Sequence, residues 1–556
     1  MAEFSQRVTT QCCSFMFVSR NASSAAGAAL SIKWILLIAF SVPMVFAVFT
    51  NHVWEDYYIT FRASKNLAEG NGLVFQIGER LHTFTSPLGV LLPASLFWVT
   101  KSDTLTLWLF RAVSCAAFAG SAGLLWRWLR EQKAGGVAQV ISLALLLGSA
   151  STVEFTIDGM ETAFLLFFCV LTLRELTRPE GLDGLRLGGA LAGMMWTRPD
   201  AFVPGAAVFA GCMLFVWPGA RWRDRRTWRG LLTAAGVGVA LYGPWVAWTW
   251  WYYGTPIPHT ITAKAFLAPE FSLAGLLSST PLKLLSGQSM MTWVFMPPYF
   301  DFGGWPTGFT MISRLLVLLT CFLWVFRKVN AVGRAASFAA FTGAFYLQAI
   351  PVAPWYTPVW LLLAVIALGC GAEALLTSMR EGGWGRRLLG TAFVFLVASQ
   401  VAMLVMTAIQ LRYQQILIED NGRRKIGEWL SAHGRPGDTV MLECLGYIGY
   451  FSQLRMLDYP GLSSAEVVRA RAEHGVIFMS MPLHFKPTWI VLRPGEYWPM
   501  LNAGKLNDYD AIKTWDANPA IASIRFLPGR NFLRHDAAFI LLRRRQESVL
   551  PAPVTP

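Results

Sequence analysis

The hydrophobic pattern of this 556-residue chain consists of long apolar runs separated by short polar loops. A helix of about 20 apolar residues crosses a bilayer, so the pattern predicts an α-helical polytopic membrane protein with about eleven transmembrane helices. A shorter run at 86–99 is predicted to be an interfacial helix on the outer side. The predicted spans are 33–50, 107–126, 137–153, 160–173, 187–199, 201–217, 230–252, 311–326, 335–350, 355–377 and 388–411.

Basic residues gather in alternate loops between these runs. One set of loops holds 17 Lys and Arg against six acids, and these loops are 127–133, 174–186, 221–229, 327–334 and 380–387. Cytoplasmic loops are enriched in Lys and Arg, so this set and the N-terminus are predicted to face the cytoplasm. Most of the net charge of +14 is therefore loop charge at a membrane surface, and no nucleic-acid partner is predicted.

An odd number of spans places the polar tail, residues 412–556, outside the membrane. The tail opens with a helix-period segment and continues with short apolar runs at 438–444, 488–494 and 537–543, which read as buried strands. We therefore expect an extracytoplasmic α/β domain after a transmembrane domain at 1–411. The transmembrane part carries two long outer loops, 51–106 and 253–310.

An acidic pair, Glu55 and Asp56, follows the first span directly. It opens an amphipathic segment predicted to be a helix that ends at the Gly70-Asn71-Gly72 turn. A carboxylate is a common general base where a hydroxyl must be activated, so the pair is a candidate catalytic site. The alternative is a structural pair that binds Arg62 or Lys65 at the membrane surface.

Other unusual polar residues lie at the outer ends of later spans and in the second outer loop. Lys264 is suited to bind a lipid phosphate, because it places one cation at a membrane surface. Arg198 with Asp158 or Glu161 reads either as a binding site or as a structural pair between helix ends. His259 and the Trp355-Tyr356 pair are weaker substrate-binding candidates, since loop histidines and interfacial aromatics are common. No phosphate-binding P-loop, Ser/His/Asp order or His/Cys zinc spacing is visible in the sequence.

The order of these motifs resembles the polytopic GT-C glycosyltransferases, in particular bacterial arabinofuranosyltransferase-like enzymes of the cell envelope. Almost the whole chain takes part in the resemblance. One departure is Glu55, where many relatives have Asp. The matching segments are Glu55-Asp56, Tyr58 to Arg62, Gly72 to Phe75, Gly78 to Arg80, Thr83 to Pro87, Gly159 to Thr162, Thr197 to Asp200, Tyr253 to Lys264 and Leu445 to Ser452.

The resemblance implies a GT-C fold and inverting transfer of a sugar from a polyprenyl-phosphate donor outside a bacterial cytoplasmic membrane. The acceptor would be a cell-envelope glycan, a lipid or a protein. Asp56 would be the base with Glu55 as its neighbour, and Lys264, Arg198 and Arg62 would bind the donor phosphate. A monophosphate leaving group requires no metal cofactor, although Asp56 with Asp158 is a candidate site for a divalent cation.

Two other classes of function stay open at this point. A transporter or lipid flippase would need ionisable residues facing a central cavity, and the span centres are nearly free of charge. A non-catalytic envelope scaffold would use the tail, with Glu443 and the segment 445–451, to bind a partner.

Overall fold

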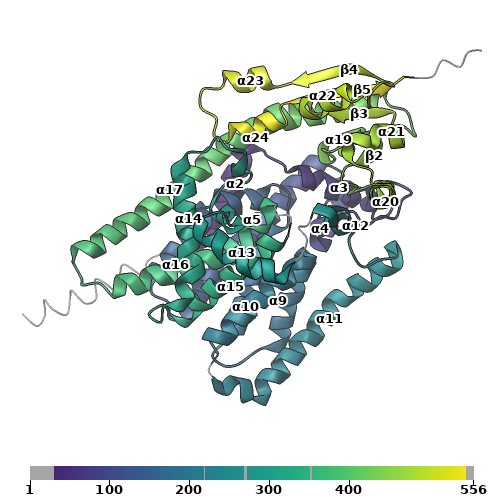
Figure 1. Ribbon diagram of the computed structural model, residues 1–556. Coiled ribbons are helices and arrows are strands. Elements are labelled where there is room, and N and C mark those ends of the chain that lie inside the picture. Colours follow the sequence, from purple (N-terminus) through teal and green to yellow (C-terminus); the bar gives the residue numbers. More distant parts are fainter. Residues whose placement is uncertain (1–30, 218, 268–271, 351–352, 546–556) are drawn as a thin grey trace, which may run out of the picture.

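The computed structural model describes residues 31–217, 219–267, 272–350 and 353–545. Within these ranges every predicted span is helical (Figure 1). The run at 137–153 is broken at Ser149 into two helices that meet at a bend of 55°. The helices are α2 (Ile32–Thr50), α5 (Asp103–Glu131), α6 (Gly136–Gly148), α7 (Ala150–Ile157), α8 (Thr162–Leu176), α9 (Gly184–Thr197), α10 (Phe202–Phe215), α11 (Arg225–Tyr253), α14 (Thr307–Phe322), α15 (Ala331–Ala349), α16 (Pro358–Thr377) and α17 (Trp384–Gln414).

The predicted spans differ in length and in apolar character. In the described part of the chain six helices are long and apolar enough to cross a bilayer by themselves, and the bent pair α6 and α7 raises this number to seven. The remaining predicted spans are shorter or less apolar helices of the same bundle. The helices α8, α9 and α10 have 14 or 15 residues, which at 1.5 Å per residue is only about 21 to 23 Å. They pack against longer neighbours, and the chain is a multi-pass membrane protein with spans of unequal length.

Helix α16 lies at the centre of the bundle. Its residues are apolar on all sides, and nearly all of its first fourteen residues are buried. A helix that is hydrophobic all round is typical of a position with neighbours on every side. In contrast α11 packs mainly on α9 and exposes most of its apolar surface, as expected for a peripheral helix in contact with lipid.

The two outer loops form short helices that lie on one end of the bundle. The first loop contains α3 (Glu55–Ala68) and α4 (Pro87–Thr100), which agree with the predicted amphipathic helix and the predicted interfacial helix. Helix α3 ends where Gly70 and Gly72 adopt positive φ values of 86° and 90°, a conformation that glycine enters without steric cost. The second loop contains α12 (His259–Lys264), η3 (Ala265–Leu267), α13 (Leu273–Ser286), η4 (Met290–Phe295) and η5 (Phe300–Phe302).

The chain after α17 forms a five-stranded sheet with short helices, here called the sheet region. No loop separates it from the last span, because α17 continues through the π-helical segment η8 (Gln415–Arg423) into α18 (Arg424–His433). The sheet has the order β2-β1-β3-β5-β4, in which β1 is parallel to β2 and β3 and β5 is antiparallel to β3 and β4. The strands are β1 (Thr439–Leu442), β2 (Arg455–Asp458), β3 (Trp489–Leu492), β4 (Tyr509–Asp516) and β5 (Ala538–Arg544), and the helices are α19 (Gly446–Ser452), α20 (Ala465–His474), α21 (Met481–Phe485), α22 (Pro494–Asn502), α23 (Asn518–Ser523) and α24 (Arg530–His535).

The sheet region and the first outer loop share a hydrophobic core. Alternate residues of β1, β3 and β5 point to one face of the sheet, where they pack with Ile426 and Leu430 of α18. Ile59 of α3 and Phe75 of the first loop belong to the same cluster. Figure 1 shows α3 between the bundle and the sheet region. Because this core contains residues from both parts, the sheet region has a fixed position above the outer end of the bundle.

We expect labelling to place residue 223 and residue 514 on opposite sides of the membrane. The first lies in a basic loop and the second on the exposed strand β4, and both side chains are exposed. In a background without native cysteines, a membrane-impermeant maleimide applied to intact cells should label Thr514→Cys and spare Arg223→Cys until the cells are lysed. The reverse pattern would contradict the predicted orientation, in which the sheet region is extracytoplasmic.

Candidate active site

The start of α3 is fixed by a buried arginine of the bundle. Arg111 of α5 is fully buried and donates hydrogen bonds to the carbonyl of Ile157 (2.7 Å) and to the side chain of Asn51 (3.1 Å). It also bonds the carbonyl of His52. The backbone N–H of Trp54 then donates to the carbonyl of Asp158 at 3.0 Å. These bonds hold the four residues before Glu55, so the first turn of α3 has a defined position.

Glu55 points from this turn toward the sheet region. Its carboxylate accepts a hydrogen bond from the backbone N–H of Gly446 (3.1 Å) and lies 3.3 Å from Arg423. A Cβ atom at position 446 would overlap the Glu55 carbonyl, so only glycine allows α19 to approach this closely. Burial raises the pKa of Glu55 to about 8, although Arg423 acts against this rise. Glu55 is thus a contact between α3 and the sheet region.

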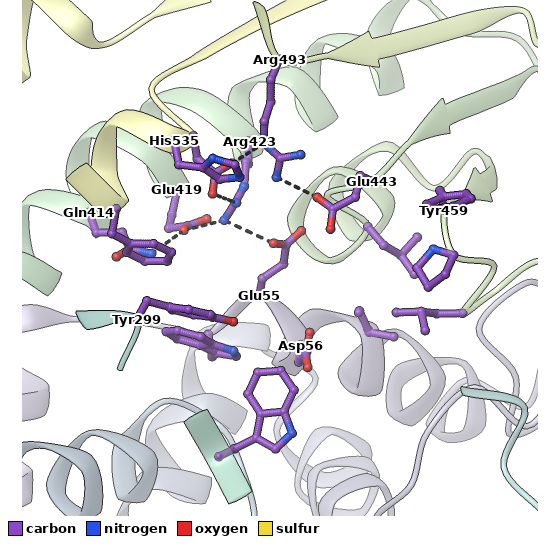
Figure 2. Close-up of a pocket in the computed structure, with 18 of the residues that line it drawn as sticks. Glu55, Asp56, Tyr299, Gln414, Glu419, Arg423, Glu443, Tyr459, Arg493 and His535 are labelled. Carbon is purple, nitrogen blue, oxygen red and sulfur yellow. Dashed lines mark hydrogen bonds and ion pairs between the residues drawn. The ribbon is translucent and has the colours of Figure 1, made fainter. Parts of the chain in front are cut away.

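Arg423 is the centre of a buried ionic network (Figure 2). Its guanidinium lies 2.8 Å from Glu419 and 2.6 Å from Asp536, in addition to Glu55. A second arginine, Arg493, shares Asp536 and extends the network to Glu443 at 2.7 Å. Burial tends to raise the pKa of Asp536, but the two arginines outweigh it and hold this pKa below its usual range. The network joins α3, η8 and the sheet region.

In contrast to Glu55, Asp56 lines two cavities. Among the described residues its carboxylate has no hydrogen-bond or ion-pair partner within bonding distance. Burial raises its pKa, and the nearby charge of Lys264 partly offsets this effect. Two cavities meet at this side chain, because Asp56, Ile59, Lys264, Trp355 and Leu462 line both of them.

The first cavity, here called the tail-side cavity, has a volume of about 340 Å³ and lies between the bundle and the sheet region. Aromatic rings from three segments form part of its wall. Tyr299 stacks on Trp54 with ring centres 5.5 Å apart and on Phe532 at 4.5 Å. The charged residues of its lining are Glu55, Asp56, Lys264, Glu419, Arg423, Glu443, Arg493 and Asp536.

The second cavity, here called the membrane-side cavity, has a volume of about 400 Å³. Its polar part contains Arg198, which lies 3.7 Å from Glu161 and 3.0 Å from Asp200 and 4.4 Å from the ring centre of Tyr356. Its apolar part includes Phe202 and Ile261, which are 63% and 45% exposed on the surface of the bundle. The cavity therefore joins a charged end, where Arg198 is paired with Glu161 and Asp200, to an apolar and exposed side.

The structure brings most of the predicted site residues together. Asp56 and Lys264 line both cavities, Glu55 lines the tail-side cavity, and Arg198, Glu161 and Tyr356 line the membrane-side cavity. The ammonium of Lys264 lies 5.5 Å from the ring centre of Trp355, and no carboxylate of the described residues lies within ion-pair distance of it.

Three other predicted residues have structural contacts and line neither of the two cavities. Arg62 donates to the carbonyl of Gly449 at 2.7 Å and stacks on Phe75, so it binds the sheet region rather than a phosphate. The ring of His259 bonds the carbonyl of Gly461 at 3.0 Å. Asp158 is fully buried and accepts a hydrogen bond from the backbone N–H of Met160. Within the described residues no group of three or more His, Cys, Asp or Glu side chains is placed to hold a metal ion, and Asp158 lies outside the cavities that Asp56 lines.

Several residues of the site were not predicted from the sequence. Arg423 and Glu419 lie in η8, Arg493 and Asp536 lie in the sheet region, and Tyr299 lies in the second outer loop. A signal existed for the first two, because charged residues directly after a long apolar span fall at the membrane surface. Nothing in the local sequence of Asp536 or Tyr299 distinguishes either residue from an ordinary surface residue.

The comparisons with known proteins agree with a GT-C fold. Two crystal structures of ArnT from Cupriavidus metallidurans are similar over 92% of this chain. The structure bound to undecaprenyl phosphate has a TM-score of 0.50 and a sequence identity of 14%, and 98% of its own chain is covered. The apo structure has a TM-score of 0.52 and a sequence identity of 13%, and 97% of its own chain is covered. An oligosaccharyltransferase structure from Archaeoglobus fulgidus, a complex with Zn and sulfate, has a TM-score of 0.48, 12% identity, and coverage of 87% of this chain and 72% of its own.

At the level of sequence the comparisons find less. A family model described as a domain of unknown function (DUF8728) matches residues 408–537, which include η8 and most of the sheet region. No curated protein matches the chain. The similar structures therefore show that the chain has the GT-C fold, and its chemistry must be argued from its own residues.

We expect Arg423→Gln to destabilise the folded protein strongly. The substitution leaves the buried carboxylates Glu55, Glu419 and Asp536 without their shared cation, and breaking a buried ion pair in this way costs about 3 to 5 kcal/mol. The thermal midpoint of the detergent-solubilised protein should fall, and the sheet region should become more sensitive to protease.

Arg424→Gln is the matched control for this substitution. Arg424 is the next residue, but its ion pair with Glu428 is exposed, and exposed pairs contribute at most about 1 kcal/mol. Equal stability of Arg423→Gln and Arg424→Gln would show that the buried network does not hold the two parts together.

Proposed function

We propose that the protein is a membrane glycosyltransferase that transfers a sugar from a polyprenyl-phosphate donor to an extracytoplasmic acceptor. The observation that carries the proposal is the position of Asp56. This carboxylate has no partner among the described residues and lies where the two cavities meet, next to the cation Lys264. Displacement of a phosphate from a sugar needs a base to accept the proton of the attacking hydroxyl and a cation to stabilise the departing phosphate, and here the two groups share one wall.

The membrane-side cavity supplies the features that a lipid-linked donor requires. Lys264 supplies a cation without an ion-pair partner among the described residues, Arg198 supplies a second cation that Glu161 and Asp200 already bind, and Phe202 and Ile261 line the apolar side. A polyprenyl chain would lie against the apolar residues while its phosphate binds the cations. Glu161 and Asp200 hold Arg198 in place. ArnT, which has the same fold, has been crystallised with undecaprenyl phosphate.

The tail-side cavity is the proposed site of the acceptor. In an inverting transfer, Asp56 accepts the proton of an acceptor hydroxyl as that oxygen attacks the anomeric carbon of the donor. The bond between the anomeric carbon and the phosphate oxygen breaks, and Lys264 and Arg198 stabilise the departing polyprenyl phosphate. Glu55 shares its charge with Arg423 and positions α3, so its role in the chemistry is indirect.

The proposed reaction takes place on the outer face of a bacterial cytoplasmic membrane. The basic loops support this orientation, because they lie at the end of the bundle away from α3 and the sheet region. Nucleotide sugars are absent outside the cell, so a donor carried by a membrane lipid suits a site on this face. The acceptor could come from the envelope as a glycan, a lipid or a protein.

We expect Asp56→Asn to lower sugar transfer by about 10²- to 10⁴-fold, the usual contribution of a general base. The thermal midpoint should stay near that of the wild type, because the Asp56 carboxylate has no partner among the described residues. The measurement is turnover per folded molecule with a radiolabelled polyprenyl-phosphate sugar pool as donor.

Asp103→Asn is the control, since Asp103 is an outer-face carboxylate that bonds Lys65 and Tyr450 and lines neither cavity. It should affect stability more than turnover. Near-normal turnover in Asp56→Asn would remove Asp56 from the mechanism.

We expect Lys264→Gln to lower kcat/KM for the lipid donor by roughly 10- to 150-fold, which corresponds to the loss of about 1.5 to 3 kcal/mol from a hydrogen bond to a charged group. Lys283→Gln removes a lysine from the same outer loop, on α13 and outside both cavities, and should leave the donor kinetics unchanged. An equal effect of the two variants would mean that Lys264 acts through the general surface charge and not at the donor phosphate.

A further inference from the structure

The floor of the tail-side cavity contains two buried oxygen atoms that lack a hydrogen-bond partner among the described residues. They are Oε2 of Glu419 and Oε1 of Gln414. Both residues line the cavity and are 1% and 5% exposed. Their other polar atoms bond each other, since the amide of Gln414 donates to Oε1 of Glu419 at 3.3 Å. A buried polar atom without a partner is costly, so this floor is suited to a ligand that donates hydrogen bonds.

The arginines of the same cavity are already occupied. Arg423 binds Glu55, Glu419 and Asp536. Arg493 binds Asp536, Glu443 and Glu496. An anionic ligand would therefore find few free donors and would lie close to several carboxylates. Lys264 is the remaining cation of the lining, and in the proposed function it faces the donor phosphate.

The charges of the lining add to the case against an anionic ligand. Its carboxylates outnumber its cations, with five acids against three Lys and Arg residues. Tyr299 is held between Trp54 and Phe532, so both faces of its ring are covered and its hydroxyl, which lies toward Glu55 and Asp56, is the group that it offers to a ligand (Figure 2).

We infer that the tail-side cavity selects a hydroxyl-bearing sugar ring without negative charge as acceptor, and that Glu443 excludes anionic sugars by occupying Arg493. This inference rests on the proposed function and specifies its acceptor. Ring hydroxyls donate hydrogen bonds to Glu419 and Gln414 on the floor. The Glu443 carboxylate lies 2.7 Å from Arg493 and is 47% exposed, so it is accessible at the cavity.

The test is binding of three glycosides of matched size to the full-length protein in detergent micelles. The probes are methyl β-glucoside, methyl β-glucuronide and methyl β-glucosaminide, and saturation-transfer NMR gives their relative affinities without any turnover. We expect the glucoside to bind at least about tenfold more tightly than the glucuronide, because like charges placed together are strongly unfavourable. The glucosaminide should also bind more tightly than the glucuronide, since the carboxylates of the lining outnumber its cations.

Glu443→Gln should change this preference. It frees donors of Arg493 for the carboxylate of the glucuronide and should raise the affinity ratio of glucuronide to glucoside about tenfold. Glu496→Gln is the matched control, since Glu496 also binds Arg493, at 2.9 Å, but lies outside the cavity lining. A glutamine there still accepts the hydrogen bond that Arg493 donates from its backbone N–H. Thermal midpoints measured in parallel show that both variants are folded.

Three results would overturn the inference: a preference of the wild type for the glucuronide over either of the other two glycosides, equal shifts in the two glutamine variants, or no saturable binding of any glycoside. Each of these is independent of Asp56 and the lipid donor. Neutral glycosides that bind as expected while no sugar is transferred would contradict the proposed function and leave the cavity's selectivity intact. Sugar transfer to anionic acceptors that depends on Asp56 would support the proposed function and contradict the selectivity of the cavity.

Discussion

The architecture depends on one buried charge, the guanidinium of Arg423. It emerges from the last span and lies within 3.3 Å of carboxylates from α3, from its own segment η8, and from the end of α24. A charge removed from water needs a partner at short range, since its desolvation penalty is larger than its Coulombic attraction to a distant or mobile partner. The three segments are far apart in the sequence but cannot separate without leaving charges unpaired. The position of the sheet region over the bundle follows from this constraint as much as from the shared apolar core.

The same constraint explains why two adjacent acids have different roles. Successive residues of an α-helix point about 100° apart. Once Glu55 faces Arg423 and Gly446, Asp56 points in another direction, onto the wall that the two cavities share. The first acid attaches α3 to the sheet region, and the second has no partner among the described residues. A pair that forms one acidic motif in the sequence therefore divides into a structural residue and, in the proposed function, a base.

Local patterns were sufficient to predict the parts of the fold that local interactions determine. Apolar runs gave the positions of the membrane helices, amphipathic spacing gave α3, and short apolar runs gave β1, β3 and β5. Strand β4 was missed because most of its residues are exposed, so it carries no alternating pattern. The motifs around Asp56, Lys264 and Arg198 indicated residues that line common cavities. The partners of Arg62 and Arg423 were missed, because ion pairs and carbonyl contacts between distant segments leave no periodicity in either one.

The distribution of paired and unpaired polar groups distinguishes the proposed reaction centre more sharply than any motif does. Around the two cavities most charges have partners: Arg198 with Glu161 and Asp200, Arg423 and Arg493 with their carboxylates. Asp56 and Lys264, which lie on the shared wall, have no such partner among the described residues. Keeping these two groups unpaired in a partly buried place has an energetic cost that folding does not recover. In the proposed function this cost is offset when substrates bind, because a phosphate then contacts Lys264 and a hydroxyl contacts Asp56. The paired charges around the shared wall are stabilised within the fold, and the two unpaired groups on the wall would be completed by the substrates.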